Sequence, residues 1–305
     1  MQTFPLRTTL LLSVIVLAVT QGSGGQALPG GPRDEKPHRP QAIPKSVRDR
    51  FERNAIELRD DAQKLVPDAH IMIYNGRRVR PGEAPWVVAF VDSDRRSQAV
   101  CGGALVAPSW ILTAEHCGIR PSEDLAVIGQ PELTSHSSVT SLNLACAGPK
   151  GSDLALVRLA TASASVPLAA EASPDSNQLA GQEMRIFGWG MTEEGSASKH
   201  LLKADVPIIS RETCQAQYPT DAVCATCFCA WDQRGITDAC QFDSGGPGIL
   251  SKVAADGPTQ VGVIREGAGC GQKPGIYSFV PGRQAWISHV IRAVEASGAC
   301  PEVTQ

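Results

Sequence analysis

Aromatic residues are scarce in this chain of 305 residues, at 5% of the sequence, and methionine occurs only 4 times. An excess of charge of either sign is also lacking. The 28 basic residues stand against 31 acidic ones, which gives a formal net charge of −3. A nucleic-acid-binding protein needs a strongly basic face, so we expect no nucleic-acid partner. There is no Asn-x-Ser/Thr sequon, which excludes N-glycosylation.

Long hydrophobic runs are lacking apart from one near the start of the chain. Residues 10–19 are mostly aliphatic, follow the basic Arg7 and precede a series of small residues that ends at Ala27. This run is too short to span a bilayer, whereas a basic, an apolar and a small-residue region in that order are typical of a signal peptide. We therefore predict a signal peptide over residues 1–27, a secreted protein and no membrane span.

Cysteine, in contrast, is plentiful, with 10 residues. In the oxidising environment that secretion implies, an even number predicts disulfides. The crowding of Cys224, Cys227 and Cys229 raises the alternative of a zinc site, but no histidine lies nearby to complete it. We expect neither a metal nor another cofactor.

A leader of different composition precedes the rest of the chain. Residues 28–44 are rich in proline, glycine and charge, which predicts an extended linker. Ser46 and Asp49 then form a capping box, and apolar residues at three- to four-residue spacing predict an amphipathic helix up to about Leu65. We interpret residues 28–72 as a propeptide. Its helix either packs against a catalytic unit or is a frayed leader.

From Ile73 onward, short β-rich runs alternate with turns. No long helical pattern separates these runs, so parallel βα units are not expected, and a single helix closes the chain over residues 283–296. Many short strands joined by turns favour an all-β barrel architecture. The clearest predicted strands are 86–91, 104–106, 110–113, 154–157, 184–187 and 260–264.

Three motifs carry the chemistry. Ser244 lies in the segment Asp-Ala-Cys-Gln-Phe-Asp-Ser-Gly-Gly-Pro, His116 in Thr-Ala-Glu-His-Cys, and Asp153 in Ser-Asp-Leu-Ala-Leu. A serine is a poor nucleophile at neutral pH unless a base activates it, and a histidine oriented by an acid is such a base. With these motifs in the order His, Asp, Ser, and with flanking Cys-Gly-Gly-Ala, Gly-Trp-Gly and Lys-Pro-Gly-Ile-Tyr segments, the chain resembles the trypsin/chymotrypsin-like serine endopeptidase family.

The resemblance implies an all-β fold of two six-stranded antiparallel β-barrels with a C-terminal helix, here over residues 73–305. It also implies an acyl-enzyme mechanism in a cleft between the barrels. Ser244 is then the nucleophile, His116 the general base and acid, and Asp153 the residue that orients the imidazole. The implied partners are polypeptide substrates and protein protease inhibitors.

Further roles follow from the same resemblance. Asp238 matches the acid at the base of the S1 pocket, with Gly267 and Gly275 as pocket walls, which implies cleavage after Arg or Lys. Ile73 matches the mature N-terminus of the family. In a zymogen its new ammonium would pair with Asp243 after proteolysis.

The resemblance also implies three disulfides, Cys101–Cys117, Cys214–Cys229 and Cys240–Cys270. The other four cysteines leave three possible pairings open. These four are Cys146, Cys224, Cys227 and Cys300.

The chain departs from the family at five positions. Met72 replaces the usual basic residue before the mature N-terminus. Phe242 replaces the glycine whose backbone N–H, with that of Ser244, forms the oxyanion hole. The other three departures are Glu115 beside the histidine and the pair Arg265 and Glu266, which replaces Ser-Trp. All of these except Glu115 favour an alternative function, that of a catalytically impaired homologue acting as a secreted binding or regulatory protein.

Overall fold

The computed structural model describes Ile73 and residues 76–168, 178–191, 196–218, 223–235, 237–250, 257–267 and 270–302. The predicted signal peptide (1–27) and propeptide (28–72) lie outside the described residues. Across the described ranges, no helix has both the length and the apolar character needed to cross a membrane.

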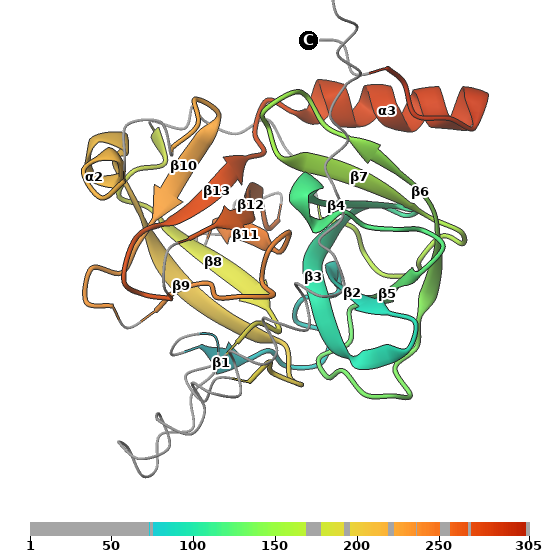
Figure 1. Cartoon of the computed structure of the whole chain (residues 1–305), viewed down its shortest axis with the longest axis horizontal. Helices are drawn as coiled ribbons and strands as arrows, with labels where there is room; N and C mark the ends of the chain where they lie inside the picture. The colour runs from blue at the N-terminus through green and yellow to red at the C-terminus, as the bar shows by residue number, and fades with distance from the viewer. Residues whose placement is uncertain are drawn as a thin grey trace, which may run out of the picture. The chain divides into compact units, whose positions relative to one another are not determined.

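The first six-stranded barrel is closed in the order β2-β3-β4-β7-β6-β5 (Figure 1). Strand β2 is apolar along nearly its whole length and buried, whereas β6 alternates buried and exposed residues, as expected of a strand with one face to solvent. The strands are β2 (Val87–Asp92), β3 (Arg95–Ala107), β4 (Trp110–Ala114), β5 (Asp124–Ile128), β6 (Thr140–Ala147) and β7 (Leu154–Leu159).

The second barrel is formed by the order β9-β10-β13-β12-β11-β8, and the pairing of β9 with β8 closes it. The short strand β1 (Arg77–Arg78) adds to the edge of β9. All pairings in both barrels are antiparallel, so the expected fold of two six-stranded antiparallel barrels is confirmed. The strands are β8 (Glu183–Gly188), β9 (Leu202–Ile209), β10 (Cys227–Ala230), β11 (Pro247–Leu250), β12 (Gln260–Glu266) and β13 (Gly275–Phe279).

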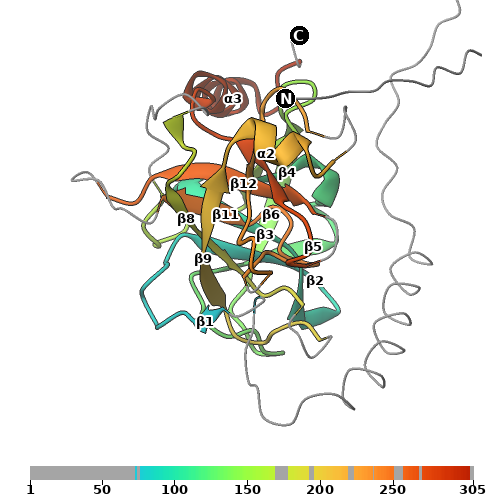
Figure 2. The same ribbon diagram turned by 90° about the vertical axis from the view of Figure 1, so that its left-hand side faces the viewer.

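In the described part of the chain, two α-helices accompany the barrels. The short α2 (Arg211–Gln215) begins at Ser210, whose hydroxyl accepts a hydrogen bond from the backbone N–H of Thr213. The expected C-terminal helix is α3 (Gln284–Ser297), seen nearly end-on in Figure 2. Its buried face packs on the first barrel, in a cluster with Trp110 and Leu154.

Five disulfides join all ten cysteines. The pairs Cys101–Cys117, Cys214–Cys229 and Cys240–Cys270 are present. The four cysteines whose pairing the sequence left open form Cys146–Cys300 and Cys224–Cys227. The first of these two disulfides joins the chain beyond α3 to β6.

Candidate active site

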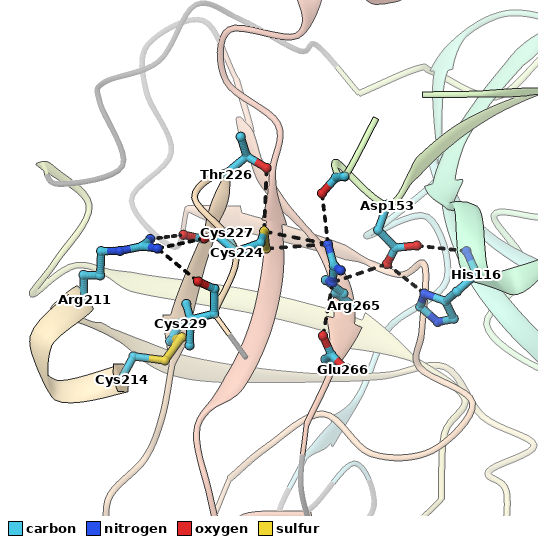
Figure 3. Close-up of a disulfide and its surroundings, with 12 residues drawn as sticks. His116, Asp153, Arg211, Cys214, Cys224, Thr226, Cys227, Cys229, Arg265 and Glu266 are labelled. Atoms are coloured by element: carbon cyan, nitrogen blue, oxygen red, sulfur yellow. Dashed lines mark hydrogen bonds and ion pairs between the residues drawn. A yellow bond between two sulfur atoms is a disulfide. The ribbon is translucent and has the colours of Figure 1, made fainter. Parts of the chain in front are cut away.

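The pair formed by His116 and Asp153 lies at one end of the first barrel (Figure 3). His116 belongs to the 3-10 helix η1 (Glu115–Cys117), which directly follows β4. Its ring Nδ1 lies 2.8 Å from Asp153 Oδ2, and its backbone N–H donates to Oδ1 at 2.9 Å. When Nδ1 carries the proton and donates it to the carboxylate, Nε2 is left as an acceptor, which is the tautomer that a general base requires.

Ser244 reaches the same cleft from the second barrel. Its carbonyl oxygen accepts a hydrogen bond from the N–H of Gly102 in β3 at 2.7 Å. The next residue, Gly245, has φ +82°, and a Cβ there would lie 2.4 Å from the carbonyl oxygen of Gly102. Glycine is thus required for this loop to approach the first barrel so closely.

The cleft has a volume of about 410 Å³ and contains His116, Asp153 and Ser244 in its lining. Within the described ranges, the Ser244 hydroxyl makes no hydrogen bond to His116. Nucleophile and base are often further apart in an empty site than in a substrate complex.

Phe242 adopts the left-handed conformation, with φ +73°. This conformation is unfavourable for a residue with a Cβ, and it is the one that a glycine adopts without strain. The backbone N–H groups of Phe242 and Ser244 have no hydrogen-bond partner in the part of the chain that the structure describes. The loop thus presents two backbone donors without a partner among the described residues, on a backbone conformation that does not itself require the Phe242 side chain.

The strain at Phe242 predicts that glycine is more favourable than alanine at this position, which is the reverse of the usual order. We expect Phe242→Gly to be more stable than Phe242→Ala by about 1 kcal/mol, because alanine keeps the unfavourable positive φ and glycine does not. Chemical denaturation of the two variants measures the difference. The control is the same pair of substitutions at the exposed neighbour Gln241, where alanine should be at least as stable as glycine; the same order at Phe242 would contradict the prediction.

Asp238 lies in the lining of the cleft with its carboxylate buried. The carboxylate accepts hydrogen bonds from the N–H groups of Ala239 at 2.8 Å and Gly271 at 2.9 Å. Burial raises the pKa of Asp238 to about 6, and these two donors partly oppose the rise. A Cβ on Gly275 would lie 3.2 Å from Asp238 Oδ1, and one on Gly267 only 3.7 Å from the Cα of Gly275, so both glycines leave room in front of the acid.

Asp243 is fully buried behind Ser244. Its carboxylate accepts hydrogen bonds from the N–H groups of Gly190 at 2.8 Å and Cys240 at 2.9 Å. No cation is paired with it among the described residues, and burial raises its pKa to about 7. Ile73 is also fully buried, in the core of the second barrel.

Arg265 extends from the end of β12 toward Asp153, and its Nε lies 3.8 Å from Asp153 Oδ2 and 3.2 Å from Glu266 Oε1. Burial, with the nearby charge of Asp153, raises the pKa of Glu115, while the charge of Arg265 opposes this rise. Arg265 is thus ion-paired with the aspartate that contacts His116.

One feature of this region was not anticipated from the sequence. Arg265 Nη1 lies 3.7 Å from the sulfur atoms of both Cys224 and Cys227, so a disulfide borders the site (Figure 3). The Cys-x-x-Cys spacing was the signal, but nothing in the sequence placed it beside Arg265.

Comparisons with known proteins agree with this geometry. A sequence profile of the family described as Trypsin matches residues 73–287. Human serine protease 56 is 32% identical over 273 residues, which cover 84% of this chain and 44% of that protein. Bovine coagulation factor XI is 31% identical over 240 residues, covering 70% of this chain and 37% of that protein.

A bacterial relative matches over most of its length. The trypsin of Saccharopolyspora erythraea is 32% identical over 220 residues, covering 68% of this chain and 93% of that protein. The chain spans less than half the length of the two mammalian relatives. The fold, the cleft between two barrels and these matches together show that the chain belongs to the trypsin family of serine proteases.

Proposed function

We propose that this protein is a secreted serine endopeptidase that cleaves polypeptides after Arg or Lys. The observation that carries the proposal is the 2.8 Å contact between His116 Nδ1 and Asp153 Oδ2 in the cleft that also contains Ser244 and Asp238. The five disulfides support an oxidising environment.

In the proposed mechanism, His116 Nε2 takes the proton of Ser244 as Oγ attacks the peptide carbonyl. The imidazolium that forms is stabilised by Asp153 and then gives the proton to the leaving amine. The N–H groups of Phe242 and Ser244 stabilise the oxyanion of the tetrahedral intermediate. Water then repeats the same sequence of proton transfers and releases the acyl group.

The preference for Arg or Lys rests on Asp238. The cleft lies open in front of its buried carboxylate because Gly267 and Gly275 have no side chains. A guanidinium or ammonium entering the cleft would pair with this carboxylate through charge-assisted hydrogen bonds. The exposed acid Glu266 also lines the cleft, and it favours basic residues upstream of the scissile bond.

Activation is proposed to follow removal of the signal peptide (1–27) and the propeptide (28–72), which leaves a catalytic domain over residues 73–305. The buried carboxylate of Asp243 has no cationic partner among the described residues, and an ammonium on Ile73 would supply one. This charge pair would hold the loop that presents the two oxyanion donors.

Labelling with a fluorophosphonate tests the enzyme assignment. In protein whose N-terminus has been sequenced and begins at Ile73, we expect stoichiometric labelling, because the probe reacts with an activated serine. Ser244→Ala should abolish the labelling and reduce peptide hydrolysis by at least about 10⁵-fold. Ser138→Ala, at an exposed serine outside the cleft, should label like the unmodified protein.

A second candidate function is that of an impaired homologue that binds peptides without cleaving them. It is favoured by the strained Phe242 and by the absence of a Ser244–His116 hydrogen bond in the described part of the chain. Processed protein that binds Arg-containing peptides but does not react with the probe would support this second function and overturn the first.

A further inference from the structure

The disulfide Cys224–Cys227 differs from the other four in the size of the loop that it closes. Its sequence separation is 3, against 15, 16, 30 and 154 for the others. The two residues between the cysteines are exposed, Cys224 is half-buried and Cys227 is buried. A thiol in solution therefore reaches Cys224 Sγ more easily than Cys227 Sγ.

Polar groups surround the two sulfur atoms. Arg265 Nη1 lies 3.7 Å from each of them, and the Thr226 hydroxyl lies 3.6 Å from Cys224 Sγ. A guanidinium stabilises a thiolate, and a more stable thiolate is a better leaving group in thiol–disulfide exchange. The surroundings thus favour cleavage of this sulfur–sulfur bond.

The backbone around the disulfide is held by contacts that do not depend on it. Arg211 donates hydrogen bonds to the carbonyl oxygens of Val223 at 3.1 Å, Cys224 at 2.9 Å and Cys227 at 3.2 Å. Strand β10, which begins at Cys227, pairs with β13. A loop this short also contributes the least chain entropy to stability, so we expect the fold to persist after reduction.

We propose that Cys224–Cys227 is a thiol–disulfide exchange site whose co-substrate is a small dithiol, and that Arg265 couples its redox state to the active site. The thiolate of the dithiol attacks Cys224 Sγ, and the bonding electron pair leaves on Cys227 Sγ beside Arg265. The second thiol of the reagent, after losing its proton to solvent, attacks the mixed disulfide. Cys224 is released as a thiolate and takes up a proton, and the dithiol becomes a cyclic disulfide. Two electrons have then passed to the protein.

The coupling arises because Arg265 contacts both sites. Its Nε faces Asp153 Oδ2, while its Nη1 faces the sulfur atoms and donates to the carbonyl oxygen of Gly151 at 3.3 Å. Among the described residues, the other charged or titratable groups facing this network are Glu266, Glu115, Arg211 and, across Asp153, His116. A Cys227 thiolate adds negative charge and competes with Asp153 for the guanidinium.

The added negative charge is expected to change the pH profile of peptide cleavage in one direction. This part of the inference rests on the proposed function. A more negative environment stabilises the imidazolium of His116. The acid limb of the pH profile of kcat/KM then moves to higher pH by about half a pH unit. At a pH on that limb, the rate falls about threefold on reduction.

Titration with dithiothreitol, followed by alkylation and peptide mass spectrometry, tests the exchange site without using activity. Cys224 and Cys227 should become alkylated at a dithiothreitol concentration at least tenfold below that needed for the other eight cysteines. Arg265→Met should slow this reduction about tenfold. Arg185→Met, which removes a guanidinium paired with Asp205 on the second barrel, should not. Reduction no earlier than at the other disulfides, or at an unchanged rate in Arg265→Met, overturns the exchange site.

The pH profile of peptide cleavage tests the coupling under the same mild reduction. The acid limb should shift in the unmodified protein, return on reoxidation, and not respond to dithiothreitol in the double variant Cys224→Ala/Cys227→Ala. If Cys224–Cys227 is reduced selectively but the pH profile of peptide cleavage does not move, the coupling is overturned and the exchange site stands. Absence of Ser244 labelling overturns the proposed function and the coupling with it, while the alkylation pattern still decides whether the exchange site exists.

Discussion

Replacing Asp238 with serine is expected to lower kcat/KM for substrates with Arg at the cleavage position by about 10³-fold. A guanidinium entering the cleft would then be desolvated without an anionic partner, and such an unpaired buried charge costs about 3–5 kcal/mol. Substrates with Leu at this position should lose far less, so the ratio of the two kcat/KM values measures the specificity role. The matched control is Asp232→Ser, at a buried aspartate that pairs with Arg234 and does not line the cleft. An unchanged Arg preference in Asp238→Ser would contradict the assignment.

The same carboxylate predicts a pH dependence. Because burial raises the pKa of Asp238 to about 6, the empty pocket loses its negative charge as the pH falls below that value. Binding of a small amidine cation such as benzamidine should therefore weaken, approaching tenfold per pH unit well below pH 6. Competitive inhibition measured between pH 4.5 and 8 checks this, with the asparagine variant Asp238→Asn expected to show weak, nearly pH-independent binding.

Asp243→Asn is expected to reduce kcat/KM of the processed protein about 10²- to 10³-fold. In the proposed active state, its carboxylate pairs with the ammonium of Ile73, and removing one partner of a buried ion pair costs about 3–5 kcal/mol. The oxyanion donors of Phe242 and Ser244 flank this residue in the sequence, so the loss should fall mainly on kcat. Equal activity of the variant and the unmodified protein would exclude the activation mechanism.

In the uncleaved precursor, Asp243→Asn is expected to increase stability, whereas in the processed protein it decreases activity. The pKa of Asp243 is raised from 3.8 to about 7 by burial, so the folded state binds more protons than the unfolded state between these values. The free energy of unfolding then falls as the pH rises from about 4 to 7, by an amount on the order of a few kcal/mol. Asp238 contributes a decline of the same sign up to about pH 6.

The difference between the precursor and its Asp243→Asn variant isolates the contribution of Asp243. We expect the variant to be the more stable at pH 7 and to lack part of the decline, as measured by thermal unfolding across this pH range. If the stability of the two precursors depended on pH in the same way, the carboxylate of Asp243 would be either exposed to solvent or paired with a cation, and the prediction would be wrong.

Much of the fold was predictable where a strand is buried on both faces. Strands β2 and β12 contain apolar runs, which is why their positions were clear before the structure. Strands that alternate polar and apolar residues, or that contain turn residues, could not be predicted from the sequence. Strand β6 alternates buried and exposed positions, β11 begins with Pro247 and Gly248, and only the last part of β3 was expected because its first half is polar. Pairing across the barrel stabilises such segments, and single-sequence patterns do not report it.

The sequence by itself determined the family, the residues expected to carry the chemistry and three of the five disulfides, because each depends on a local motif and on motif order. Only the tertiary structure decided the positive φ of Phe242, the pairing Cys146–Cys300, and the position of Arg265 between Asp153 and the Cys224–Cys227 disulfide. The position of Arg265 depends on how β12 and the loop before β10 lie against the first barrel, and the pairing Cys146–Cys300 depends on how the chain beyond α3 lies against β6. Contacts between segments so distant in the chain leave no pattern in the sequence of either one.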